Sequence, residues 1–127
     1  MTDPDAPLVL VIDDQPDVAE ALAALCRAAG ATVVVSASDQ RIGALLELHR
    51  PAGVVLDILM PNEDGFEALR EIAQIDAATR VLLVTGAGEN WLRMGESLGR
   101  ANGLASVQTA LKPVQSADVQ AFVESLK

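Results

Sequence analysis

The segment Gly53–Pro61, with the sequence GVVLDILMP, places one carboxylate inside an otherwise uncharged run. Four uncharged residues precede Asp57, and three apolar residues separate it from Pro61. Such a run predicts a buried strand that ends near the aspartate. Because an ionised carboxylate in apolar surroundings is unfavourable unless it is paired, we expect other polar groups to gather around the end of this strand.

The composition favours an α/β fold. Hydrophobic residues make up 50% of the 127 residues, whereas aromatic residues make up only 2%, so the core is built mainly from Val, Leu, Ile and Ala. This usage is typical of a parallel sheet that is buried on both faces. The length suits a single domain over residues 1–127, and we expect residues 1–7, MTDPDAP, to form a flexible tail.

Charge and cysteine content exclude several classes of protein. A net charge of −9 opposes binding of nucleic acid by this chain, since phosphates attract Lys and Arg. The sequence contains no apolar run of about 20 residues that could span a membrane, and its single Cys26 excludes an internal disulfide. We therefore expect a cytoplasmic protein without membrane contact, in which Cys26 is a small buried hydrophobic residue.

Short β-branched segments alternate with segments whose apolar residues recur three and four positions apart. The predicted strands are Leu8–Ile12, Thr32–Ser36, Gly53–Asp57, Arg80–Thr85 and Ser106–Leu111. Helical stripes follow each strand, and the fourth stripe consists of Leu92, Met94 and Leu98. The alternation predicts a flavodoxin-like, doubly wound α/β fold, with five parallel strands in the order 2-1-3-4-5 and helices on both faces.

Polar residues occupy the carboxyl ends of four of these strands. Asp13 and Asp14 follow the first strand, Asp57 ends the third, Thr85 ends the fourth and Lys112 follows the fifth. In a parallel sheet these ends share one edge, and ligands bind there at the point where the strand order reverses. We therefore expect the three carboxylates to converge on one cleft, with the hydroxyl and the ammonium on its other side.

Three carboxylates in one cleft indicate a bound cation. Two carboxylates about 4 Å apart repel by about 4 kcal/mol at an effective dielectric constant of 20, so the cluster requires positive charge. Mg²⁺ takes oxygen ligands and usually shares its remaining positions with phosphate. With Lys112 as a second cation and Thr85 as a hydroxyl donor, the site suits phosphoryl transfer to Asp57 as a carboxylate nucleophile.

The ordered motifs VIDD, DILMP, VTG and LKP resemble those of the response regulator receiver domain, the phospho-accepting module of two-component signalling. The resemblance covers nearly the whole chain. It implies that Asp57 is the phosphorylated residue and Asp14 a direct Mg²⁺ ligand. It also implies that Asp13 holds the metal through water and that the backbone carbonyl of Leu59 is a further ligand.

The resemblance also assigns the groups that contact the phosphoryl group. Thr85 corresponds to the hydroxyl that moves toward it, and Lys112 to the lysine that pairs with it. Pro113 corresponds to the proline after that lysine, where the family often has a cis peptide bond. Phosphorylation is expected to pull Thr85 and Lys112 inward and to switch the surface formed by the fourth helix, the fifth strand and the fifth helix.

Several positions depart from the family pattern. Thr109 stands where a switch aromatic is common, which places the usual rotation of a Tyr or Phe in doubt. Gly86 replaces the usual Ala after Thr85 and loosens the switch loop. Leu59 and Ala87 are apolar at positions that influence phosphoryl lifetime, so we expect a slowly hydrolysing phosphoaspartate.

The partner implied by the resemblance is a histidine kinase or a phosphotransfer protein, with an unknown output protein or domain. The chain would then be a signalling switch that catalyses only its own phosphorylation and dephosphorylation. An alternative is a docking or dimerisation module with vestigial phosphorylation, and a homodimer is left open. A flavin carrier is disfavoured because the acidic DDQPD loop would repel a phosphate, and an aspartate-nucleophile phosphatase because Leu59 replaces its second Asp.

Two further residues have open roles. His49 is the sole histidine, and its place just before Pro51 at the end of a helical segment indicates a surface side chain rather than a phosphodonor. Trp91 is the sole tryptophan, near the start of the fourth helix. It is either partly buried or an anchor for a partner, because Trp is enriched at binding hot spots.

Overall fold

The computed structural model describes residues 5–36, 41–60 and 63–127, and within them the main sheet has five strands. These are β1 (Leu8–Ile12), β2 (Thr32–Ser36), β3 (Gly53–Asp57), β6 (Arg80–Thr85) and β7 (Ser106–Leu111). The strand order is β2-β1-β3-β6-β7, and all neighbouring strands are parallel. The predicted fold class, strand order and strand bounds are therefore confirmed.

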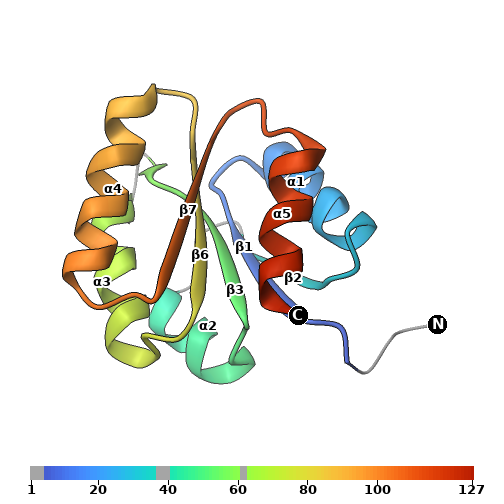
Figure 1. The fold of residues 1–127 in the computed structure, drawn as a ribbon, viewed down its shortest axis with the longest axis horizontal. Coiled ribbons are helices and arrows are strands. Elements are labelled where there is room, and N and C mark those ends of the chain that lie inside the picture. Colours follow the sequence, from blue (N-terminus) through green and yellow to red (C-terminus); the bar gives the residue numbers. More distant parts are fainter. Residues whose placement is uncertain (1–4, 37–40, 61–62) are drawn as a thin grey trace.

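Helices cover both faces of this sheet (Figure 1). They are α1 (Pro16–Ala28), α2 (Ile42–His49), α3 (Gly65–Ile75), α4 (Glu89–Ala101) and α5 (Ser116–Leu126). Helices α1 and α5 lie on one face, whereas α2, α3 and α4 lie on the other. Among the described helices, none is both long and apolar enough to cross a membrane.

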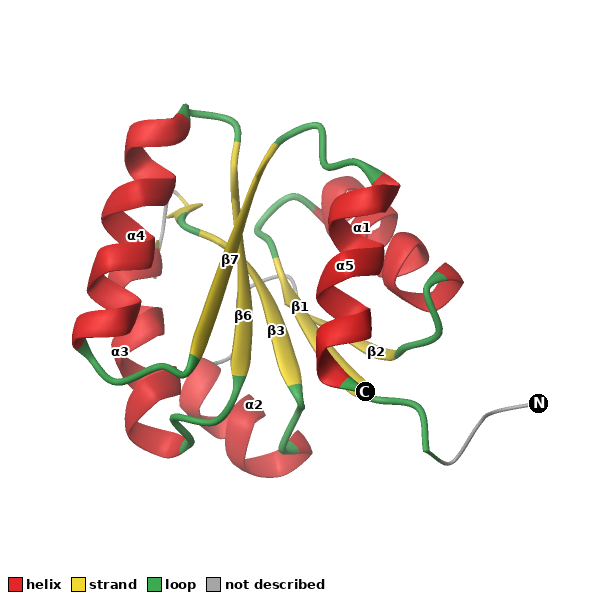
Figure 2. Ribbon diagram, viewed as in Figure 1, coloured by secondary structure: helices red, strands yellow, loops and turns green. Residues whose placement is uncertain are grey.

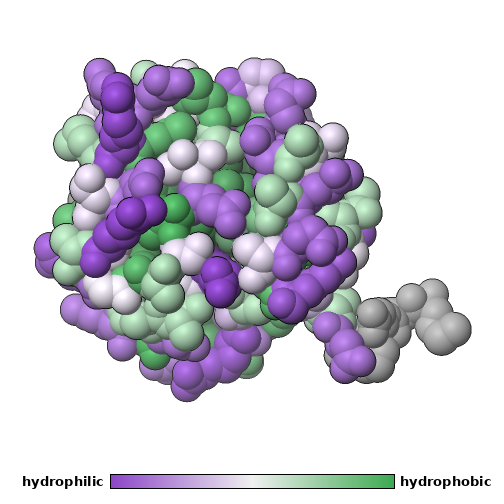
Figure 3. Space-filling view, in the orientation of Figure 1, coloured by the Kyte–Doolittle hydropathy of each residue, from purple (hydrophilic) through white to green (hydrophobic). Residues whose placement is uncertain are grey.

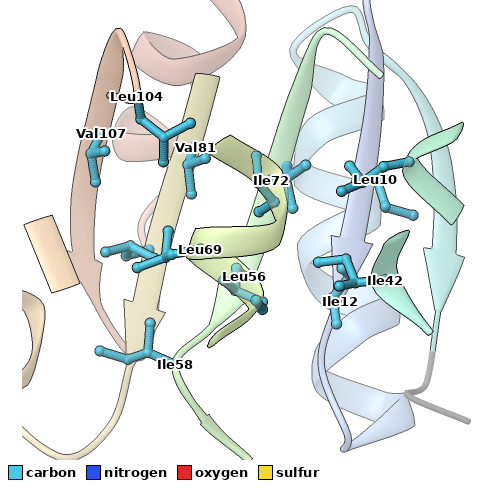
Figure 4. Packing of buried hydrophobic residues seen from close by; sticks show 14 of the residues in the cluster. Leu10, Ile12, Ile42, Leu56, Ile58, Leu69, Ile72, Val81, Leu104 and Val107 are labelled. Carbon is cyan, nitrogen blue, oxygen red and sulfur yellow. The ribbon is translucent and has the colours of Figure 1, made fainter. Parts of the chain in front are cut away.

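The strands divide the core into two layers because their side chains alternate between the faces of the sheet. Val9 and Val11 of β1 pack with α1 and α5, whereas Leu10 and Ile12 pack with the other three helices. Figure 4 shows part of this second layer, where side chains of β1, β3 and β6 lie close to residues of α2 and α3. Both layers consist mainly of Val, Leu, Ile and Ala, as the composition predicted.

Helix α1 begins and ends at residues that favour those positions. Pro16 is its first residue, where the missing N–H of proline removes no intrahelical hydrogen bond. Gly30 lies just beyond its end with a φ of 104°, a left-handed conformation that glycine adopts without strain. Residues 1–4 of the predicted tail lie outside the described residues. The carbonyl of Pro7 accepts a hydrogen bond from the N–H of Thr32 at 2.9 Å, which ties the chain to β2 just before β1 begins.

A short hairpin follows β3 and was not predicted. Its strands are β4 (Leu59–Met60) and β5 (Glu63–Asp64), which pair in antiparallel fashion. The next residue, Gly65, begins α3 directly against the backbone of Ile58. A Cβ at this glycine would lie 2.4 Å from the Cα of Ile58, so only glycine fits this close approach. The start of α3 is thereby fixed against the residue that follows Asp57.

The predicted apolar stripe of α4 is partly wrong. Leu92 is buried, but Met94 has 56% of its surface exposed. The two positions are only two residues apart, so they cannot share one face of a helix. The buried face instead continues through Gly95 and Gly99, where an added Cβ would meet Leu83 or Val107 of the sheet within 3 Å.

The loops after β1, β3, β6 and β7 emerge at one edge of the sheet, which is the upper edge in Figure 2. Strands β1 and β3 are neighbours, and they connect to helices on opposite faces, so this edge contains the reversal point of the fold. Figure 3 shows the face of α4, β7 and α5, where hydrophilic residues cover much of the two helices and hydrophobic patches are exposed between them.

Candidate functional site

Three carboxylates meet at the reversal point. Asp13 and Asp14 follow β1, and Asp57 is the last residue of β3. Because Ile12 pairs with Leu56, the next residue of each strand lies at the same level. One oxygen from each carboxylate lies within 4.8 Å of an oxygen of the other two. The predicted convergence of Asp13, Asp14 and Asp57 is therefore found.

The first of these carboxylates is held from several directions. Asp13 is fully buried, and its backbone N–H donates to the carbonyl of Ser36 at 3.3 Å. Its Oδ1 accepts the backbone N–H of Gln15 at 2.9 Å, while its Oδ2 faces Lys112. The contributions of Gln15 and Ser36 were not predicted, because both involve backbone atoms whose direction the side-chain pattern does not report.

The ammonium of Lys112 lies between two of the carboxylates. Its Nζ is 2.8 Å from Asp13 Oδ2 and 2.9 Å from Asp57 Oδ2. The backbone N–H of Lys112 donates to the carbonyl of Thr85 at 2.9 Å, which fixes the end of β7 against β6. The ammonium therefore contacts Asp57 without a phosphoryl group, and the expected inward movement of Lys112 on phosphorylation stays a prediction. The two buried carboxylates attract this ammonium and hold it between them.

The electrostatics of this pairing favour charged Lys112. Partial burial disfavours the charged ammonium, but hydrogen bonds to Asp13 and Asp57 outweigh burial and raise the pKa of Lys112 above its ordinary value of 10.5. The lysine therefore stays positively charged at neutral pH. Asp57 itself is only 5% exposed, so only a small part of its surface is accessible to a reaction partner.

Thr85 is buried at the end of β6, beside both β3 and β7. Its Oγ1 accepts the backbone N–H of Ala87 at 3.1 Å, so the hydroxyl shapes the loop that leads to α4. In the same loop, Gly86 is exposed and has no positive φ, so its backbone does not require glycine.

The other predicted positions lie near this centre or along β7. Leu59 begins β4, two residues after Asp57. Thr109 is half-buried in β7, opposite Leu83 of β6. The peptide bond between Lys112 and Pro113 is cis, which agrees with the prediction from the family resemblance.

The chemistry of the donor set fits a divalent cation. If all four groups are ionised, three carboxylates and one ammonium leave the cluster with an excess of two negative charges. The oxygen atoms of Asp13, Asp14 and Asp57 are the ligand type that Mg²⁺ takes. Asp14 is partly exposed, which gives an ion access from solvent.

Three residues outside the cluster have the following environments. Cys26 is buried in α1, as predicted, and burial raises the pKa of its thiol to about 11. His49 is half-buried at the end of α2, on the opposite side of the sheet from α1. Trp91 is 38% exposed, and its ring stacks on Phe66 with a centroid distance of 6.1 Å.

Comparison with known proteins agrees with this geometry. The family model for the response regulator receiver domain matches residues 9–123. The transcriptional regulatory protein PdtaR of Mycobacterium tuberculosis is 31% identical over 127 residues, covering 97% of this chain and 59% of that protein. The chain thus spans well under two thirds of the length of that relative.

Solved structures share the fold. A response regulator from Colwellia psychrerythraea aligns with a TM-score of 0.77 and 24% identity, covering 96% of this chain and 97% of that one. The chemotaxis protein CheY4 of Vibrio cholerae aligns with a TM-score of 0.78 and 18% identity, covering 96% and 99%. The chain belongs to the response regulator receiver domain family, whose members accept a phosphoryl group in two-component signalling.

Proposed function

We propose that Asp57 accepts a phosphoryl group from a phosphohistidine donor, either a histidine kinase or a phosphotransfer protein. One observation carries this proposal: the Lys112 ammonium lies within 2.9 Å of both Asp13 and Asp57, and Asp14 completes the cluster. An isolated structural carboxylate would need one partner. Here a nucleophile candidate, a cation and two further acids lie together at one edge of the sheet, which is the set of groups that phosphoryl transfer uses.

In the proposed step, a carboxylate oxygen of Asp57 attacks the phosphorus atom of the donor. The new O–P bond forms an acyl phosphate, and the P–N bond breaks with its electron pair passing to the imidazole of the donor. Lys112 is positioned to pair with the negative phosphoryl oxygens, because its ammonium lies 2.9 Å from a carboxylate oxygen of Asp57. Thr85, on the strand beside Asp57, offers its hydroxyl to the same group.

Asp13, Asp14, Asp57 and the backbone carbonyl of Leu59 are the groups that would hold Mg²⁺. When bound, this ion supplies positive charge that neutralises the transferring phosphoryl group. The charge excess of the acidic cluster supports this assignment. Asp13 is buried and oriented by Lys112 and Gln15, and Asp14 is the partly exposed member of the set.

The proposed output surface is formed by α4, β7 and α5. A groove of about 310 Å³ lies between these elements, and Glu89, Leu92, Thr109 and Asp118 are among its lining residues. Thr109 is small, and among the described residues that line this groove none is an aromatic whose rotation could report phosphorylation. The proposed switch therefore acts through the Thr85 loop and the position of α4, toward an output protein that is unknown.

We further propose a domain organisation, a location and a class of partner for the whole chain. Residues 1–127 form one receiver domain that works in the cytoplasm as a switch and catalyses only reactions of its own Asp57. The net charge of −9 supports a protein partner rather than nucleic acid. A homodimer through the output surface stays open.

The test is phosphorylation with acetyl phosphate and Mg²⁺, followed by measurement of intact mass. We expect the gain of one phosphoryl group, lost in Asp57→Asn and retained in Asp17→Asn, which removes an exposed carboxylate of α1 outside the cluster. EDTA should suppress the gain. A phosphorylated Asp57→Asn variant, or an unmodified wild-type protein with both acetyl phosphate and a panel of phosphorylated histidine kinases, would contradict the proposal.

The small residue at Thr109 also favours a second candidate, a docking or dimerisation module that does not depend on phosphorylation. The two candidates differ in one measurement. If Asp57→Asn binds partners or dimerises as well as phosphorylated wild type, the docking module is the better description. A difference between the two proteins supports the switch.

A further inference from the structure

Helices α3 and α4 lie next to each other on one face of the sheet (Figure 1). Side chains of both helices line a groove. We call it the α3–α4 groove. Its volume is about 590 Å³, and its lining residues are Phe66, Arg93, Met94, Ser97, Leu98 and Ala101. It adjoins the groove of the proposed output surface, because Arg93 lines both, and in that second groove Arg93 forms no ion pair with Glu89 or Asp118. None of the acidic cluster is among the lining residues of the α3–α4 groove.

We propose that the α3–α4 groove binds an amphipathic helix of a partner protein. This helix would insert large apolar side chains into the groove and place one carboxylate beside Arg93. The proposal concerns the unphosphorylated protein, so it is independent of the role of Asp57.

The shape of the groove indicates a helix as the occupant. Five of its lining residues come from α4, at positions 93, 94, 97, 98 and 101. These positions recur at the spacing of a single helix face and extend along more than two turns. A partner helix laid along such a stripe inserts side chains spaced three and four residues apart.

The exposed residues at this groove are of the types that bind partners. Met94 is 56% exposed, and Trp91, one turn from it, is 38% exposed and extends the apolar wall by stacking on Phe66. In the part of the chain that the structure describes, the other exposed large hydrophobic residues are Leu48 and Leu111, which lie on separate elements. Trp, Met and Arg are enriched in protein interfaces, and Met adapts its shape to different partners.

Charge at the groove selects an acidic group on the partner. Arg70 of α3 and Arg100 of α4 are each paired with a glutamate one turn away. Arg93 forms no such ion pair with any described residue; its guanidinium donates instead to the neutral side chain of Asn90 at 2.7 Å. The positive charge at the groove is therefore available to a carboxylate of the partner, which can accept two parallel hydrogen bonds from it.

The same charge argument disfavours a second copy of this chain. Two copies would each bring a net charge of −9, which opposes close association at low ionic strength. A partner helix with one carboxylate opposite Arg93 and neutral or basic residues elsewhere avoids this repulsion. We therefore assign the groove to a different protein rather than to self-association.

The sole tryptophan allows a direct test. The probe is a hydrocarbon-stapled helical peptide of about four turns, with leucines at i, i+4 and i+7 and one glutamate on the same edge. It contains no tryptophan, so the fluorescence of Trp91 reports its binding. We expect a saturable change in fluorescence with unphosphorylated protein, and none with a peptide of scrambled sequence.

Variants locate the binding site. Met94→Glu should weaken binding at least about tenfold, because it places a charge in the apolar groove. Arg93→Gln should weaken binding of the glutamate peptide roughly three- to tenfold but leave a glutamine peptide unaffected. Leu48→Glu is the matched control, since Leu48 is 75% exposed on α2, and this variant should bind as wild type does.

Several results would overturn the proposal that a partner helix binds the α3–α4 groove. No saturable binding, or equal affinity of wild type and Met94→Glu, excludes a helix in this groove. Equal affinity for the glutamate and glutamine peptides excludes the role of Arg93. If light scattering shows a dimer of the wild type that Met94→Glu abolishes, the occupant is a second copy and the proposed partner is wrong.

Discussion

Lys112 Nζ lies 2.9 Å from Asp57 Oδ2, although 55 residues separate the two in the sequence. The same ammonium lies 2.8 Å from Asp13, which is 99 residues away. Residues from the ends of three strands thus lie close together, because the parallel sheet brings those ends to one edge. Each group restricts the others: the acids hold the lysine, and the lysine offsets the repulsion between the acids.

Replacement of Lys112 should expose that repulsion. In Lys112→Met, the buried carboxylates of Asp13 and Asp57 lose the cation they share. We expect the free energy of unfolding to fall by about 1–3 kcal/mol in EDTA, as for a buried polar group that loses its partner. Urea denaturation followed by circular dichroism measures this change.

The matched control for this variant is Lys127→Met. Lys127 pairs with Glu124 at 3.2 Å on the surface, where an ion pair contributes at most about 1 kcal/mol. Mg²⁺ should also restore part of the stability of Lys112→Met, because it supplies positive charge to the same acids. If Lys112→Met and Lys127→Met unfold at the same urea concentration, the shared ammonium does not stabilise the cluster.

Gly65→Ala should disturb the segment that follows Asp57. Its Cβ would lie 2.4–2.8 Å from backbone atoms of Ile58, which cannot move aside as a flexible side chain could. We expect a loss of about 1–3 kcal/mol in stability, typical of overpacking, together with slower phosphorylation by acetyl phosphate. Gly86→Ala is the control, because its nearest contact would be 4.0 Å away, at Lys112 Cβ. Equal phosphorylation rates and equal free energies of unfolding for Gly65→Ala and Gly86→Ala would refute the requirement for glycine at position 65.

Thr85→Ala should loosen the loop between β6 and α4. It removes the hydroxyl oxygen that accepts the N–H of Ala87 at 3.1 Å, and the expected loss is about 1 kcal/mol. Thr85→Ser keeps the oxygen and should retain most of this stability. Hydrogen exchange at the amide of Ala87 checks the local effect: it should quicken in Thr85→Ala alone. Equal protection in both variants would exclude a structural role for the hydroxyl.

Cys26 should make the protein less stable in alkali. Burial raises the pKa of its thiol from 9.0 to about 11 in the folded state. Between these two values the unfolded chain loses the proton first, so the stability falls as the pH rises from about 9 to 11 and is unaffected below pH 9. We expect wild type to lose about 1 kcal/mol more than Cys26→Ala between pH 8 and pH 10, measured by urea denaturation. If wild type and Cys26→Ala lose the same free energy of unfolding between pH 8 and pH 10, the raised pKa of Cys26 does not cause the loss.

Most of the fold could be predicted from the sequence, because its strands are β-branched runs with abrupt ends. All five strands of the main sheet have the bounds that the sequence predicted. The short hairpin β4–β5 could not be predicted, since strands of two residues leave no periodic pattern. The exposure of Met94 was also missed, because the buried face of α4 depends on two glycines that carry no hydrophobic signal.

The candidate site, like the fold, could be predicted from the sequence only in part. The residue types Asp13, Asp14, Asp57, Thr85 and Lys112 could be picked out because each follows or ends a strand. Their hydrogen bonds could not, since these depend on backbone atoms of Gln15, Ser36 and Ala87 and on which oxygen each group faces. The roles of these residues in phosphoryl transfer stay predictions until phosphorylation is measured.

By itself, the sequence determined which residues lie in strands and which acids end them, because burial and chain reversal impose local patterns on residue type. Only the tertiary structure decided that Lys112 bridges Asp13 and Asp57 and that Trp91 stacks on Phe66. It also decided that Arg93 lies beside an apolar groove with no carboxylate partner among the described residues. These relationships join residues through packing and charge in space, and such contacts leave no periodic signal along the chain.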